Sequence, residues 1–102
     1  MTLERTIETK ACRLLLKEGC EAIKFGQGGW PDRLVVLGKA YPNAVLWIEF
    51  KADDGKLRPA QIIRHKQLAA LGQSVVVCRS ALEALGEVAK ARRLIDRTKQ
   101  RG

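Results

Sequence analysis

The sequence predicts an α/β fold in which a small mixed sheet is flanked by helices, in the order α-β-β-β-α-β-α. Near the N-terminus, apolar residues recur at spacings of three and four, which is typical of an amphipathic helix. The centre of the chain instead contains short apolar runs of strand length, separated by turns that contain glycine and proline. With 102 residues, of which 46% are hydrophobic, the chain is long enough for one domain and too apolar for an intrinsically disordered protein.

The first half of the chain is predicted to form one helix and three strands. The helix begins near Leu3 and is stopped by Gly19. Strands are expected at residues 22–25, 33–37 and 44–51. The loop at 26–31 contains three glycines and a proline, which exclude regular structure there. A turn at 41–43 should join the second and third strands into an antiparallel hairpin.

The second half is predicted to form a helix, a strand and a final helix. Pro59 suits the first turn of a helix that ends just before Gly72. The strand is expected at residues 74–78, which contain three consecutive valines. Ser80 is a favourable N-cap for the last helix, and Glu83 three residues later would complete a capping box.

The net charge of +8 points to an anionic partner, for which nucleic acid is the default. Residues 90–102 carry six basic residues against Asp96 alone, so much of the excess lies at the C-terminal end. We therefore expect a domain over residues 1–90 and a basic C-terminal helix or tail over 91–102. Arg92, Arg93 and Arg97 are predicted to follow DNA phosphates, the alternative being a segment that only increases solubility.

Several classes of protein do not fit the sequence. No apolar run approaches the roughly 20 residues of a membrane-spanning helix, so we expect no membrane association, and the N-terminal segment does not resemble a secretion signal. The three cysteines lack a CxxC spacing, which argues against a disulfide framework and a cysteine zinc site. A GxxxxGK[ST] motif is missing, so no nucleotide cofactor is expected.

The few carboxylates are placed where a metal site could form. Glu49 and Lys51 lie two residues apart on the third strand and therefore share a face. Asp32 begins the neighbouring strand, and a hairpin brings Asp32 and Glu49 to the same end of the sheet. Two carboxylates, together with the carbonyl of Phe50, suit a hard cation such as Mg²⁺ or Mn²⁺. Taken singly, Pro-Asp is more often a turn and Glu-x-Lys a solvated strand face.

The segments Gly29-Trp30-Pro31-Asp32 and Glu49-Phe50-Lys51 together resemble the signature of the PD-(D/E)XK nuclease superfamily. More narrowly, the chain resembles a stand-alone VRR-NUC domain over nearly all of residues 4–88, including the segment 55–61. The resemblance implies a restriction-endonuclease-like αβββαβ core. One departure is Arg58, where the family usually carries serine or threonine. Because arginine cannot accept helix N–H bonds, we expect a looser helix start, or a cap from Asp53 or Asp54.

The resemblance implies a divalent-metal-dependent endodeoxyribonuclease that hydrolyses phosphodiester bonds in line and leaves a 5′-phosphate. In this interpretation Asp32, Glu49 and the Phe50 carbonyl hold Mg²⁺ or Mn²⁺ with help from Glu8, which could alternatively pair with Arg5 or Lys10. Glu4, one turn earlier, is the other candidate on this helix. Lys51 would orient the attacking water and stabilise charge on the phosphate. Gln61 would form a hydrogen bond near Lys51 or the water, the alternative being an ordinary polar residue in the first turn of a helix.

Further residues are implied in DNA binding. Lys24 and Arg58 would contact the DNA backbone, and Trp30 would stack on a base or pack against the sheet. The lone His65 is expected to be a packed residue rather than a proton donor.

Small relatives resemble Holliday-junction resolvases that work as homodimers, and many are encoded by phages. We therefore expect cleavage of branched DNA by a homodimer in the cytoplasm of a bacterium, with RNA left open as a substrate. The alternative is a nuclease-like but inactive basic module that binds nucleic acid.

Overall fold

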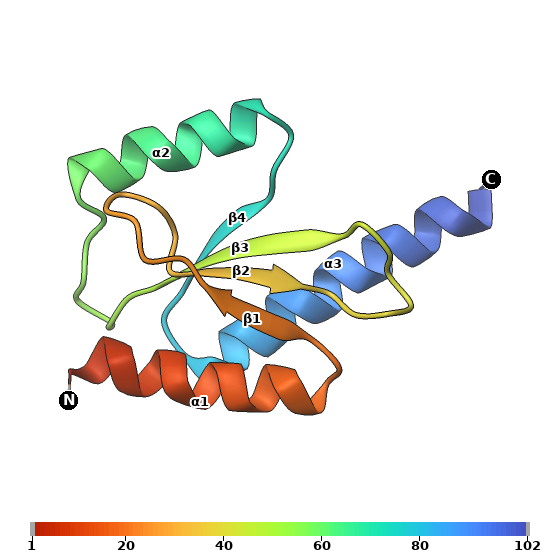
Figure 1. The fold of residues 1–102 in the computed structure, drawn as a ribbon, viewed down its shortest axis with the longest axis horizontal. Helices are drawn as coiled ribbons and strands as arrows, with labels where there is room; N and C mark the ends of the chain where they lie inside the picture. The colour runs from red at the N-terminus through yellow and green to blue at the C-terminus, as the bar shows by residue number, and fades with distance from the viewer. Residues whose placement is uncertain (1, 102) are drawn as a thin grey trace.

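The computed structural model describes residues 2–101 and has the predicted order of elements (Figure 1). The elements are α1 (Leu3–Lys17), β1 (Glu21–Lys24), β2 (Arg33–Val36), β3 (Val45–Phe50), α2 (Pro59–Ala70), β4 (Val75–Cys78) and α3 (Ala81–Arg101). No helix in this described part of the chain is long and apolar enough to cross a membrane.

The four strands form one mixed sheet in the order β1-β2-β3-β4. Strands β1, β2 and β3 are antiparallel neighbours, which confirms the predicted hairpin between β2 and β3. Strand β4 runs parallel to β3, and α2 forms the crossover that a parallel pair requires. The fold is therefore an α/β fold of the restriction-endonuclease-like kind.

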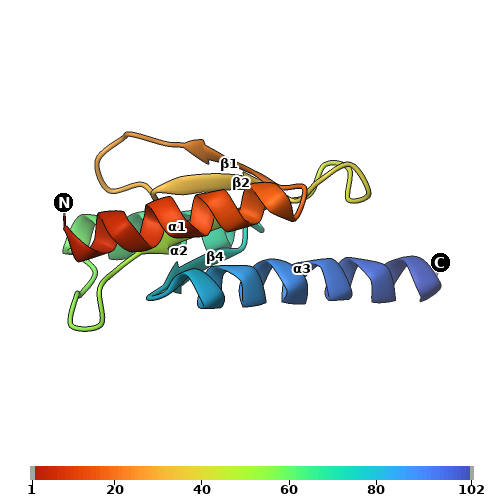
Figure 2. The same ribbon diagram turned by 90° about the horizontal axis from the view of Figure 1, so that it is seen from below.

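The hydrophobic core lies between the sheet and the pair of helices α1 and α3, which run side by side beneath it (Figure 2). Alternate residues of β3, namely Leu46, Ile48 and Phe50, are buried and belong to this core. The intervening residues Trp47 and Glu49 therefore face the other side of the sheet, where α2 lies. Glu49 therefore lies on the α2 side of the sheet. This side holds less apolar packing, since Leu68 is the one residue of α2 that is buried.

The helix starts are capped differently from the prediction in two places. The α2 start is not capped by Asp53 or Asp54; instead the Gln61 side chain accepts a hydrogen bond of 2.8 Å from the Arg58 N–H. At α3, Ser80 Oγ accepts from the Glu83 N–H at 3.1 Å, as expected. The Glu83 carboxylate, however, accepts from the Arg79 N–H, whereas in the predicted capping box it would accept from the Ser80 N–H.

Helix α3 continues without interruption across the predicted boundary at residue 90. Arg92 lies just beyond that boundary and is tied into the fold. Its guanidinium donates to the carbonyl oxygens of Leu37 at 2.6 Å and Glu18 at 2.8 Å. Arg92 therefore connects α3 to the end of β2 and to the end of α1, and the first turn of the predicted tail is part of the domain.

Candidate active site

Most of the residues predicted to be functional gather at one end of the sheet, where the start of α1, the start of α2 and the loop between β1 and β2 meet (at the left in Figure 1). They line a cleft of about 300 Å³. Predicted residues that line this cleft are Glu4, Lys24, Trp30, Asp32, Glu49, Lys51, Arg58 and Gln61. Helix, strand and loop residues far apart in the sequence therefore form one concave site.

The hairpin of β2 and β3 brings Asp32 and Glu49 together, as predicted. Arg33 pairs with Ile48 in the sheet register, so the residues one step beyond them, Asp32 and Glu49, face each other at the end of the hairpin. Asp32 Oδ2 accepts a 2.7 Å hydrogen bond from the Phe50 N–H. Because the N–H and the carbonyl of a strand residue point to the same side, the Phe50 carbonyl lies on this edge of β3 as well.

The Glu49 carboxylate is buried without full hydrogen bonding. Its side chain is 3% exposed, and Oε1 has no hydrogen-bond partner among residues 2–101. The other oxygen, Oε2, accepts from Gln61 Nε2 at 3.2 Å and lies 3.7 Å from Lys51 Nζ. Burial, together with the nearby carboxylate of Asp32, raises the pKa of Glu49 to about 7.

The chemistry of these donors fits a divalent cation. Burial also raises the pKa of Asp32, against the opposing effect of the hydrogen bond from Phe50. Two neighbouring carboxylates with raised pKa values, one with a free oxygen, are stabilised in their charged forms by a hard cation. In residues 2–101, however, no group of three or more Asp, Glu, His or Cys side chains is arranged to hold a metal. A cation here would therefore also need the backbone carbonyl and water as ligands.

Lys51 is buried at the floor of the cleft between two carboxylates. Its side chain is 8% exposed, and Nζ lies 3.7 Å from Glu49 Oε2 and 3.8 Å from Glu4 Oε1. The backbone N–H of Lys51 donates to the Cys78 carbonyl at 3.1 Å, which fixes this residue to β4. An ammonium held this way can stabilise negative charge on a bound phosphate.

Glu8 lies near this end of the sheet but does not line the cleft. Its Oε2 accepts hydrogen bonds from Lys24 Nζ at 2.9 Å and Arg33 Nε at 2.7 Å, rather than pairing with Arg5 or Lys10. Burial acts to raise the pKa of Glu8, but these two cations outweigh it and lower the pKa. The predicted trio of Glu8, Asp32 and Glu49 is therefore not brought together, and Glu4 is the α1 carboxylate that reaches the cleft.

The glycine-containing loop before Asp32 is packed against α2. Gly29 has a φ of +83°, a conformation that favours glycine, and lies close to Ala60. The Trp30 ring contacts the rings of Phe25 and Trp47, with centroids 4.8 and 5.6 Å away, and the Arg64 guanidinium lies 4.3 Å above it. This aromatic cluster favours the packing alternative for Trp30 over stacking on a base.

The other predicted residues differ in how free they are to bind DNA. Arg58 is exposed at the cleft, whereas Lys24 is exposed but also paired with Glu8. Arg93 and Arg97 are exposed in the C-terminal half of α3 and do not line the cleft. Arg92 is held by carbonyl oxygens of the fold, so it has a structural role.

His65 of α2 is half-buried, and its Nε2 has no hydrogen-bond partner within residues 2–101. Burial and the charge of Lys51 lower the pKa of His65.

Arg79 supports the site from outside the cleft, and no role was predicted for it. It follows β4, and its Nη1 donates to the carbonyl oxygens of Ala52 and Gly55, each at 2.7 Å. These carbonyls belong to the turn that directly follows Lys51, so Arg79 anchors the connection between β3 and α2. The signals in the sequence are an arginine directly after a buried strand and its place within the range 4–88 that resembles the family.

Comparisons with known proteins agree with this geometry. No family model matches the chain. A protein of Acyrthosiphon pisum secondary endosymbiont phage 1, described as "Putative nuclease p44", is 40% identical over 81 residues, which cover 76% of this chain and 83% of that protein. A solved structure described as "VRR_NUC domain" is similar with a TM-score of 0.72, covering 87% of this chain and 97% of its own. Its sequence identity is 23%, so this likeness shows a shared fold.

Proposed function

This chain belongs to the family of the 40% identical phage protein described as a nuclease and has the fold of a VRR-NUC domain, and on that basis we propose that it is a divalent-metal-dependent DNA endonuclease of the VRR-NUC type. The observation that carries the proposal is the buried Glu49 carboxylate, whose Oε1 has no hydrogen-bond partner although Asp32 and Lys51 lie beside it. Such an arrangement is costly in a domain that has no cation to bind there.

In the proposed site, Asp32, Glu49 and the carbonyl of Phe50 hold Mg²⁺ or Mn²⁺. When bound, this ion supplies a Lewis acid that stabilises charge on the phosphate. Of the two α1 carboxylates, we propose Glu4 as the one that faces the ion, because it lines the cleft and lies 3.8 Å from Lys51. Glu8 supports the site indirectly, by holding Lys24 and Arg33.

Lys51 and Gln61 act on the substrate side of the proposed reaction. Lys51 orients the attacking water and stabilises negative charge on the scissile phosphate. Gln61 donates to Glu49 and accepts from the Arg58 N–H, so it links the carboxylate to the start of α2. The amide therefore holds Glu49 in the orientation that leaves Oε1 free for a cation.

The proposed substrate is branched DNA, cut by a homodimer in the bacterial host of a phage. The phage origin of the 40% identical relative supports the proposed setting in the host cytoplasm. Lys24 and Arg58 at the cleft and Arg93 and Arg97 on α3 supply the contacts to phosphates, because all four are exposed.

The test is cleavage of four-way, flap and linear DNA with Mg²⁺ or Mn²⁺. We expect the wild-type protein to nick the branched substrates and Asp32→Ala to be inactive while still folded. Asp96→Ala is the matched control, because Asp96 is an exposed aspartate on α3, and it should keep full activity. Tight binding without cutting under all metals and pH values would instead favour an inactive binding module.

A further inference from the structure

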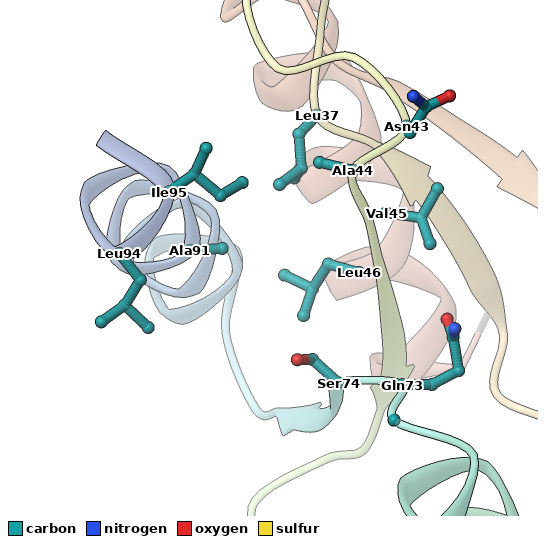
Figure 3. A pocket seen from close by; sticks show the side chains of 11 residues that line it. Leu37, Asn43, Ala44, Val45, Leu46, Gln73, Ser74, Ala91, Leu94 and Ile95 are labelled. Atoms are coloured by element: carbon teal, nitrogen blue, oxygen red, sulfur yellow. The ribbon is translucent and has the colours of Figure 1, made fainter. Parts of the chain in front are cut away.

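Two hollows in the surface differ in chemistry and in place. One, of about 310 Å³, lies between α3 and the sheet, where Ala91 and Ile95 face Leu37 and Leu46 (Figure 3). Among residues 2–101 no charged side chain lines it, so a polyanion such as DNA finds no cation there. The other, of about 220 Å³, adjoins the candidate active-site cleft and is lined by an arginine. This second hollow has the position and the charge to contact DNA.

The second hollow, which we call the α2 hollow, shares a wall with the cleft. The loop between β1 and β2 passes beside the start of α2 (Figure 1), and Gly28 and Gly29 of this loop line both the cleft and the hollow. A side chain on Gly28 would meet no atom beyond its chain neighbours within 4 Å, so the space there is open. A DNA strand with a phosphate in the cleft can therefore place an adjoining nucleotide beside the hollow. The lining consists of Gly28, Gly29, Ala60, Ile63, Arg64 and Gln67.

Arg64 supplies a planar cation to the α2 hollow. Its guanidinium lies 4.3 Å from the centre of the Trp30 ring, which covers one of its two faces. The other face can stack on a second planar group, as arginine does on nucleobases. None of the ion pairs within residues 2–101 involves Arg64, so none of the described carboxylates neutralises its charge. The arginine is thus placed to attract a nucleic acid strand and to stack on one of its bases.

The remaining side chains of the α2 hollow suit the faces and the edge of a nucleobase. Ile63 is 58% exposed and forms an apolar wall together with Ala60. Gln67 is exposed, and its amide can both donate and accept hydrogen bonds at a base edge. The volume of about 220 Å³ is below the roughly 300–1,000 Å³ of pockets that take drug-sized ligands. The hollow therefore fits one ring system rather than a larger molecule.

We propose that the α2 hollow binds one unpaired nucleobase of the DNA next to the scissile phosphate. Arg64, supported by Trp30, stacks on the base. Ile63 contacts the base, and Gln67 forms a hydrogen bond to its edge. Removing a base from a duplex stack costs free energy, and the cost is smallest for a base that is already unpaired. The hollow therefore selects DNA with an unpaired nucleotide at the cut. This inference rests on the proposed function and names the feature of branched DNA that its site recognises.

The test compares the binding of two short DNA duplexes, measured by fluorescence anisotropy at low salt without divalent metal. One duplex carries a single unpaired adenine, and the other carries an abasic sugar at the same place. Both have the same phosphates, so electrostatic attraction to the protein cancels in the ratio of their affinities. We expect the wild type to bind the adenine duplex about tenfold more tightly, as stacking of one base predicts.

Substitutions on α2 locate the site. Ile63→Ala and Gln67→Ala should each reduce the affinity ratio by at least about threefold. Ile62→Ala is the matched control and should keep the ratio, because Ile62 is also an exposed isoleucine of α2 but lines neither the hollow nor the cleft. All three changes shorten exposed side chains, so the melting temperature should stay that of the wild type.

Equal affinities of the wild type for the two duplexes would overturn the inference, as would a ratio that falls in Ile62→Ala and not in Ile63→Ala. Because binding is measured without metal, its outcome is separate from that of cleavage. A protein that prefers the adenine duplex but cuts no DNA would contradict the proposed function alone. A protein that cuts branched DNA but binds both duplexes equally would contradict this inference alone.

Discussion

Two buried glutamates, Glu8 and Glu49, lie near the same end of the sheet but on opposite sides of it, and their surroundings differ sharply. Glu8 faces two cations that hydrogen-bond to it, and its pKa is lowered. Glu49 has one oxygen without a partner and a pKa raised to about 7. The first carboxylate stabilises the fold, whereas the second costs stability and is suited to a cation. Two buried carboxylates can therefore differ in their suitability for a cation, because their hydrogen-bond partners differ.

The largest expected effect is on cleavage. Replacing Glu49 with glutamine keeps the size of the side chain and removes its charge, so we expect a loss of roughly 10³-fold or more in the nicking rate. Mn²⁺ binding, measured by calorimetry, should weaken in parallel. Glu8→Gln should retain measurable cleavage and Mn²⁺ binding at a temperature where it is folded. If Glu8→Gln abolished Mn²⁺ binding and Glu49→Gln did not, the roles of the two glutamates would be reversed.

The next effect is on stability, with opposite signs for the two residues. Since the pKa of Glu49 rises from 4.5 to about 7 on folding, ionisation opposes folding, and stability falls as pH rises through this range. Glu49→Gln should therefore stabilise the metal-free protein at pH 8, by up to about 3 kcal/mol. Glu8→Gln should destabilise it by about 2 kcal/mol, because Arg33 loses its partner in a partly buried site.

Both stability effects should become smaller in acid. The Glu8 contribution is present above the unfolded pKa of 4.5 and is lost as pH falls through its lowered folded pKa. Urea unfolding of the wild type and the two variants, from pH 8 down to the acid range, measures these differences. If both variants changed the free energy of unfolding by the same amount at every pH, the contrast between Glu8 and Glu49 would be wrong.

The smallest effect extends the contrast to the arginines of α3. Arg97 is exposed, so Arg97→Ala should leave the melting temperature unchanged and reduce the salt dependence of DNA binding by about one counterion. Arg92 donates to carbonyls of the fold, so Arg92→Ala should lower the melting temperature and leave the salt dependence nearly unchanged. Binding titrations at several salt concentrations and thermal melts distinguish the two, and the reverse pattern would place Arg92 on the DNA.

Local sequence patterns were sufficient for the elements and for the central pair of the site. The strands begin and end within about one residue of their predicted positions, because glycine, proline and apolar spacing act locally. The meeting of Asp32 and Glu49 followed from the hairpin, whose register is set by the short connection between its strands.

Contacts between distant segments could not be predicted in this way. The partners of Glu8 come from β1 and β2, 16 and 25 residues along the chain, whereas helix spacing suggested Arg5 or Lys10. The carbonyls that bind Arg92 lie 55 and 74 residues away. These pairings depend on how the elements pack, and a periodic pattern within one element does not contain that information.

The anchoring of the turn after Lys51 also bears on how this protein can evolve. Arg79 holds the turn through the backbone carbonyls of Ala52 and Gly55, and such contacts do not depend on the side chains of the turn. Asp53, Asp54 and other exposed side chains there can therefore change without moving the end of β3. Substitutions in this turn can alter the charge of the surface after Lys51 while the backbone that positions Lys51 stays in place.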